Sequence, residues 1–162
     1  MSDDVAGWLA GRLPEDWFEG APQISVDRDE ILVVGRLPRP EGDGEEIESG
    51  RIARFREDTR QQRMRIAREA ERRFGRKVAW GAECGQTRQV FTSLAAPVMT
   101  RLRQPERQVL DTLVDAGVAR SRSHALAWCV RLVGQHTDEW LTALRDAMQQ
   151  VEQVRQQGPD AA

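Results

Sequence analysis

The sequence predicts an α+β fold, with a small N-terminal sheet-plus-helix domain followed by a helical C-terminal part. Two observations predict this class. Short runs of β-branched and aromatic residues stand on both sides of an arginine-rich stretch at 51–75, whose apolar residues recur at helical spacing. Beyond residue 103, helical spacing is the dominant pattern. A chain of 162 residues can form one domain or two small ones.

Residues 1–21 are expected to form an amphipathic segment. Val5, Trp8, Leu9 and Leu13 recur at helical spacing, and the following proline is expected to stop the helix. Two interpretations are open. The helix docks on the core of its own chain, or it binds a protein partner and folds on contact.

Residues 22–94 read as strand, strand, helix, strand and strand, which is a small α+β domain. Residues 24–26 and 31–34 predict a hairpin with an acidic turn, and Gly35 is expected to end the second strand. Residues 38–50 carry five acidic residues and no periodicity, which predicts a flexible loop or linker.

The clearest helix of the sequence spans residues 51–75. Ser49 can cap its start, and Gly75 fits just past its end. Its apolar stripe consists of Ile52, Phe55, Thr59, Ile66, Ala70 and Phe74.

The polar face of this helix carries a large excess of arginine. Residues 51–77 hold 11 basic and 4 acidic residues, whereas residues 1–50 hold 4 basic and 13 acidic ones. One interpretation is contact with nucleic-acid phosphates, and the other is neutralisation by the acidic N-terminal third. The arginines that we single out for nucleic-acid contact are Arg60, Arg63, Arg68 and Arg72.

Two more strands are expected after the helix, at residues 78–80 and 89–94. Gly81 and Gly85 lie between them, and residues 85–87 look like a hairpin turn. The arginine-rich helix is expected to cover one face of the resulting sheet.

Residues 95–136 read as strand, helix, turn and helix. The strand is expected at 98–102, and Pro105 suits the first turn of the next helix. Gly117 fits the end of that helix, and Ser121 or Ser123 can cap the second one.

This segment resembles the ribbon-helix-helix repressors of the Arc and MetJ type and the CopG-like antitoxins. The resemblance implies an obligate homodimer that inserts a two-stranded antiparallel ribbon into the major groove of double-stranded DNA. The matching residues are Arg101-Leu102, Leu110, Leu113-Val114, Gly117, Ser121-Arg122-Ser123 and Ala125-Leu126.

The resemblance also implies which residues touch DNA. Met99, Arg101 and Arg103 are the candidates for base contact, with Arg101 suited to a guanine edge. The start of the second helix, at Ser121, Arg122 and Ser123, is the candidate phosphate site.

The outward ribbon positions also admit another interpretation. Pro97 offers no donor and Met99 reads bases poorly, so an apolar ribbon face covered by the α+β domain would serve dimerisation alone.

Residues 137–157 predict a last helix, with Trp140, Leu141, Leu144 and Met148 among the apolar residues on one side. Gly134 is expected to separate it from the preceding helix. This helix is an addition to the minimal ribbon-helix-helix unit and would thicken the dimer core or bridge protomers. Residues 158–162 are expected to form a frayed tail.

No catalytic motif is present: the sequence lacks GxSxG, P-loop, GxGxxG and HExxH patterns. Ser121, Ser123 and His124 fit a helix start better than a nucleophile and base. Cys84 and Cys129 are expected to be reduced thiols, because neither a CxxC nor an HxxxH pair exists. We therefore expect neither an enzyme nor a bound cofactor or metal.

No apolar run approaches the roughly 20 residues of a membrane span, and the acidic N-terminus does not resemble a signal peptide. The sequence thus predicts a cytoplasmic, homodimeric ribbon-helix-helix DNA-binding protein that regulates transcription. The alternative is a dimeric protein–protein adaptor or antitoxin-like protein that uses the ribbon-helix-helix unit for assembly. RNA binding by the arginine-rich helix is a third possibility.

Overall fold

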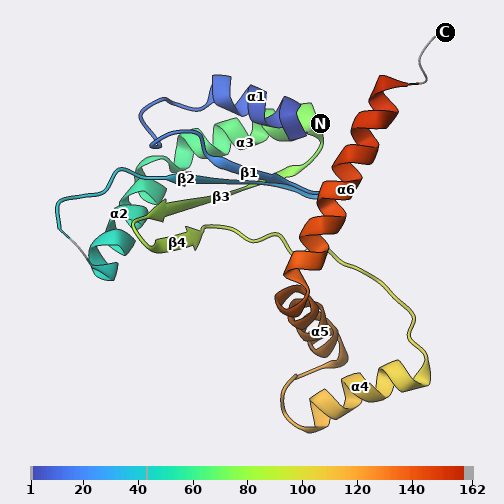
Figure 1. Cartoon of the computed structure of the whole chain (residues 1–162). Coiled ribbons are helices and arrows are strands. Elements are labelled where there is room, and N and C mark those ends of the chain that lie inside the picture. Colours follow the sequence, from blue (N-terminus) through green and yellow to red (C-terminus); the bar gives the residue numbers. More distant parts are fainter. Residues whose placement is uncertain (1, 43, 159–162) are drawn as a thin grey trace. The chain divides into compact units, whose positions relative to one another are not determined.

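A computed structural model describes residues 2–42 and 44–158 of the chain. The predicted α+β class is confirmed (Figure 1). Contacts divide the chain into an N-terminal unit that ends at Val98 and a C-terminal unit that begins at Met99. The strands of the described residues all lie in the N-terminal unit. Four residues of the tail predicted at 158–162 lie outside the described residues, as does Asp43 in the predicted acidic loop.

The N-terminal unit is built on a four-stranded sheet in the order β1-β2-β3-β4. β1 pairs with β2 and β3 with β4 in antiparallel fashion, whereas β2 and β3 are parallel. A parallel pair needs a long crossover connection, and helices α2 and α3 provide it. The strands are β1 (Gln23–Val26), β2 (Glu30–Arg36), β3 (Lys77–Cys84) and β4 (Thr87–Val90).

Both predicted hairpins are confirmed, and each turn has a local cause. In the first, the Asp27 carboxylate accepts hydrogen bonds from the backbone N–H groups of Asp29 and Glu30, at 2.8 and 2.7 Å. The Asp27 side chain thus stabilises the turn, and no glycine is needed there. In the second, Gly85 adopts a φ of 58°, which favours glycine.

Helix α1 (Ser2–Arg12) docks on its own chain, as the first of the two interpretations predicted. Val5 and Leu9 are fully buried in the N-terminal core. Arg12 also pairs with Glu69, where Nε lies 2.6 Å from Oε2. Figure 1 shows α1 and α3 on the same side of the sheet. A partner that binds this segment would therefore have to use its exposed residues.

The single helix predicted at 51–75 is wrong in one respect, because the structure has two helices there. Helix α2 (Glu45–Asp58) ends and helix α3 (Arg60–Phe74) begins at Thr59. The predicted loop at 38–50 is also wrong in its last six residues. Those residues form the start of α2, where glutamates favour the positive end of the helix dipole. Ser49 lies inside α2 and does not cap a helix.

The core lies between this helical layer and one face of the sheet. Ile31 and Val33 of β2, and Trp80 and Ala82 of β3, alternate along their strands, as expected for residues on one face. Ile52, Phe55 and Ile66 from α2 and α3 pack into the same cluster. The predicted helix end at Gly75 is confirmed, with a left-handed φ of 68°.

Three strand boundaries differ from the prediction. β2 continues through Gly35 to Arg36. The Phe18 ring occupies the space that a side chain at residue 35 would need. Gly81 lies inside β3, where a Cβ atom would come within 2.8 Å of the Gln89 carbonyl oxygen. β4 ends at Val90, although the Phe91 amide still donates to the Trp80 carbonyl at 2.7 Å.

The C-terminal unit consists of α4 (Gln104–Asp115), α5 (Arg122–His136) and α6 (Asp138–Gln157). Pro105 lies in the first turn of α4, Gly117 has a φ of 76° after it, and Ser121 caps α5, all as predicted. Gly134 does not separate α5 from α6, because α5 continues through it to His136.

The core of this unit is small. Its buried members are Leu110, Ala119 and Ala125, and Leu102 is among the half-buried residues packed against them. No other described segment pairs with residues 98–102 as a strand. A single chain does not test the predicted ribbon strand, because its pairing partner would come from a second chain. Within the described residues, no helix is long and apolar enough to cross a membrane.

Candidate functional site

The residues proposed for base contact lie in the segment before α4, which has no regular secondary structure. Met99 is 97% exposed and Arg101 is exposed, whereas Leu102 is half-buried against the core of the C-terminal unit. The Arg103 amide donates to Glu106 Oε2 at 2.7 Å, which fixes the start of α4. The Leu102 carbonyl accepts a hydrogen bond from Arg107 at 2.6 Å. The segment is thus anchored at its C-terminal end and open before it.

The residues proposed for phosphate contact lie at the N-terminus of α5. Ser121 Oγ accepts a hydrogen bond from the His124 amide at 3.1 Å, which makes Ser121 the cap. The guanidinium of Arg122 is engaged with Asp111 on α4 through two bonds of 2.7 and 2.8 Å. That contact lowers the pKa of Asp111 and raises that of Arg122. Arg122 therefore joins the two helices at the end of α5 that presents free backbone N–H groups.

A second site lies in the N-terminal unit, where α2 and α3 meet the edge of the sheet. We call it the arginine pocket. Its cavity has a volume of about 340 Å³. It is lined by Arg56, Arg60, Arg63, Met64, Ala67, Val78, Trp80, Phe91 and Thr92.

Arg63 is the buried member of the arginine pocket, with only 6% of its surface exposed. Its Nε donates to the Thr59 hydroxyl at 2.9 Å, and its Nη2 donates to the Arg56 carbonyl at 2.6 Å. The guanidinium carbon lies 4.9 Å from the centre of the Phe91 ring, a cation–π distance. These contacts brace the break between α2 and α3 at Thr59.

The electrostatics around Arg63 are unusual for a buried charge. Buried charges are normally paired, yet in the described part of the chain no carboxylate forms an ion pair with Arg56, Arg60 or Arg63. Burial, and then the charges of Arg56 and Arg60, lower the pKa of Arg63 to about 10. Trp80 is another residue that lines this pocket, and its Nε1 atom is a buried donor without an acceptor.

The four arginines proposed for nucleic-acid contact do not lie together. Arg60 and Arg63 line the pocket, whereas Arg68 and Arg72 are exposed and line no part of it. Across the described residues, no ion pair joins an arginine of 51–75 to an acid of the N-terminal third. Direct pairing among the described residues therefore does not account for the arginine excess.

Sequence reasoning missed Arg56, Trp80, Phe91 and Thr92 as pocket residues. One signal was available. Arg63 falls at helical spacing between Thr59 and Ile66, on the stripe that is otherwise apolar. An arginine on a buried stripe indicates a polar site inside the unit.

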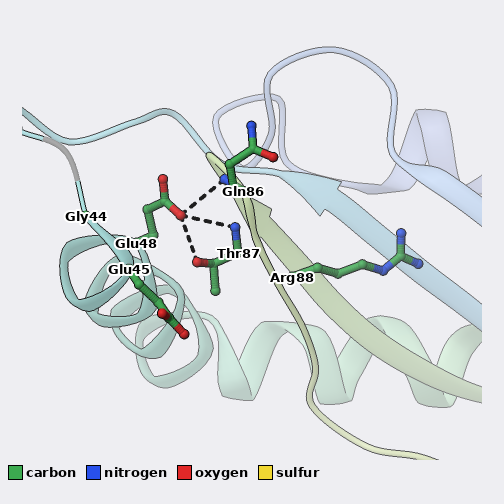
Figure 2. A pocket seen from close by; sticks show the side chains of 6 residues that line it. All are labelled: Gly44, Glu45, Glu48, Gln86, Thr87 and Arg88. Carbon is green, nitrogen blue, oxygen red and sulfur yellow. Dashed lines mark hydrogen bonds between the residues drawn. The ribbon is translucent and has the colours of Figure 1, made fainter.

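A larger cavity of about 590 Å³ lies beside Glu48 and the turn between β3 and β4 (Figure 2). Glu48 accepts bonds from the Gln86 and Thr87 amides, both at 3.1 Å, and from the Thr87 hydroxyl at 2.7 Å. Arg39 donates to its other oxygen at 3.0 Å. The Thr87 and Arg39 bonds lower the pKa of Glu48. With four donors, this carboxylate serves to hold the turn.

The described residues contain no cluster of histidine, cysteine or acidic side chains that could hold a metal ion. Both cysteines are free in the structure. Cys84 is buried, and burial raises its pKa.

Comparison with known proteins identifies the class to which this fold belongs. Residues 3–90 match the family described as the N-terminal domain of Rv1265-like proteins, and residues 103–155 match the family described as the Mb1296 C-terminal domain. The two matches fall in the two units of the structure. The chain belongs to the Rv1265-like family.

Its relatives include the uncharacterized protein Mb1296 of Mycobacterium bovis and the uncharacterized protein Rv1265 of Mycobacterium tuberculosis. Each is 63% identical over 159 residues, which cover 96% of this chain and 70% of the relative. No solved structure matches the chain.

Proposed function

We propose that this protein is a homodimeric DNA-binding protein of the ribbon-helix-helix type that regulates transcription. One observation carries the proposal. A segment without helix or strand at 98–102 precedes two helices, is anchored to their core by Leu102, and leaves Met99 and Arg101 exposed. This order of elements is the one that a ribbon formed by two chains requires.

The need for a second chain follows from how little the C-terminal unit buries. The three buried residues in its described part form too small a core for an independent domain, because small units bury too little apolar surface to offset their lost chain entropy. Side chains that could meet a second copy are exposed on α4, α5 and their connection: Val109, Val118, Val130, Leu132 and Val133.

In this dimer, Arg101 would reach into the major groove, where its fork matches guanine O6 and N7. Met99 and Arg103 would flank it on the ribbon. The free N–H groups at the start of α5 would hold a backbone phosphate, beside Ser121 and Ser123. Arg122 would hold α5 in place through Asp111.

A titration of duplex DNA of mixed sequence, across a salt series and on a sample whose mass has been measured by light scattering, tests this function. We expect a dimer whose affinity falls steeply with salt, because phosphate contacts release counterions. Arg101→Ala should weaken binding by about tenfold or more, since one bidentate guanine contact is worth about 1–3 kcal/mol. Arg145→Ala on α6 removes the same charge from an exposed position and should change the affinity little.

A monomer, or an Arg101→Ala dimer that binds as tightly as the parent, would rule out the ribbon. A dimer that ignores DNA even at low salt would favour a protein–protein adaptor. The exposed apolar side chains of α6 favour that second candidate: Trp140, Leu144, Met148, Val151 and Val154.

A further inference from the structure

Three guanidinium groups gather around the arginine pocket without an acidic partner. Arg63 uses Nε and Nη2 to brace the helix break, and the exposed Arg56 and Arg60 stand beside it. Like charges repel each other, so this arrangement costs free energy unless an anion joins it. In the described residues the anion is not a carboxylate of the same unit.

The pocket also holds an unused hydrogen-bond donor. Trp80 is 4% exposed, and its Nε1 atom is the one buried side-chain nitrogen or oxygen among the described residues that lacks a partner. A buried donor without an acceptor costs about 1–3 kcal/mol. The residue that carries this donor lines the same cavity as the arginines. The lining residues thus combine guanidinium groups that have no acidic partner with one indole N–H that has no acceptor.

The remaining walls are apolar. Met64, Ala67, Val78 and Phe91 line the cavity beside the charged groups. Its volume of about 340 Å³ is at the lower end of small-molecule sites. An inorganic anion would leave the apolar side chains of the cavity exposed to water. An uncharged apolar molecule would leave the arginines without an anionic partner.

We infer that the arginine pocket binds a small organic oxyanion, whose charged group meets Arg56, Arg60 and Arg63 and whose apolar body lies against Met64 and Phe91. Trp80 Nε1 donates to an oxygen of this ligand. The charged group is a phosphate ester or a carboxylate, both of which accept the planar fork of arginine. The site lies within the N-terminal unit and does not depend on DNA binding by the C-terminal unit.

Isothermal titration calorimetry of the full chain with phenyl phosphate and with benzoate tests the site, and the tighter of the two identifies the charged group. Inorganic phosphate and phenol are the comparison compounds, because the first lacks the apolar ring and the second lacks the anionic group. We expect at least one of the two organic anions to bind more tightly than both comparison compounds. Arg60→Gln should weaken that binding by about tenfold, the usual worth of a charge-assisted hydrogen bond.

Arg68→Gln is the matched control, since Arg68 is exposed on the same helix and lies outside the pocket. It should leave the affinity within about twofold of the parent. Trp80→Phe keeps an aromatic wall and removes the donor, and it should weaken binding about fivefold. Should this variant fail to fold, Thr92→Val tests a polar lining group at an exposed position.

Three results would overturn the inference. The first is no binding of either organic anion. The second is equal loss in Arg60→Gln and Arg68→Gln, which would indicate general charge attraction. The third is inorganic phosphate binding at least as tightly as both organic anions, which would exclude the apolar wall.

Discussion

Arg122 of α5 donates from Nε and Nη2 to the two carboxylate oxygens of Asp111 of α4, at 2.7 and 2.8 Å. The pair lies at the surface, with 58% and 42% of the two side chains exposed. Its geometry is the fork-to-fork type that gives direction as well as attraction. It sets where α5 starts relative to α4, and so where the free N–H groups of α5 point.

This ion pair predicts a pH-dependent coupling between the two helices. Because Arg122 lowers the pKa of Asp111 below its ordinary value of 3.8, the stabilisation is present above pH 3.8 and is lost as the pH falls below it. A double-mutant cycle of Asp111→Ala and Arg122→Ala, followed by thermal unfolding, should show favourable coupling near neutral pH and none in strong acid. Coupling that is unchanged across this range would contradict the ion pair. The effect should be small, since the pair is exposed.

Glu48 predicts a stronger acid sensitivity in the N-terminal unit. Its carboxylate is buried and accepts hydrogen bonds from the Thr87 hydroxyl and from Arg39, and also from the Gln86 and Thr87 amides. Since the bonds from the Thr87 hydroxyl and Arg39 favour the charged form most, its folded-state pKa lies below 4.5, and its contribution is present above pH 4.5 and is lost below it. Glu48→Gln should lower the Tm near neutral pH and flatten its fall in acid. Glu45→Gln, an exposed neighbour in the first turn of α2, is the control and should keep the parent's acid profile.

Gly35 predicts a steric conflict with Phe18. A Cβ atom at residue 35 would stand 2.1 Å from Cδ1 of the Phe18 ring. Gly35→Ala should therefore lower the free energy of unfolding by about 1–3 kcal/mol, the usual cost of overpacking. Adding Phe18→Ala should make the alanine at residue 35 far less costly, which chemical denaturation of both backgrounds would measure. Gly7→Ala in α1 has open space around it, so it should be neutral or stabilising. Additive losses in the double variant would argue against the conflict.

The elements of this protein were predictable where the cause is local. The Asp27 turn, the cap at Ser121 and the left-handed Gly75 depend on neighbouring residues, and the sequence predicted the turn or helix boundary that each one forms. The break at Thr59 was not predicted, because the apolar stripe continues through it and only Arg63 interrupts the pattern.

The candidate sites depend on contacts between residues far apart in the sequence, and these were harder to predict. Glu48 contacts Gln86 and Thr87, which lie 38 and 39 residues further along the chain. Local sequence does not reveal these contacts, so the acidic residues around Glu48 were predicted to form a loop. The arginine pocket needs β3 and Phe91 to return beside α3, which periodicity does not encode. The segment with Arg101 was predicted as a strand, and its pairing in a dimer stays a prediction.

The single parallel pairing of the sheet also predicts an order of folding events. The hairpins β1–β2 and β3–β4 join residues close in sequence, so each can form early and alone. β2 and β3 are joined by the long crossover that contains α2 and α3, so their pairing requires closure of a long loop. The contact between Val33 and Trp80 is therefore expected to form late and to cost more chain entropy. The arginine pocket is lined by those two helices, β3 and the residues after β4, so it would be completed only in this last step.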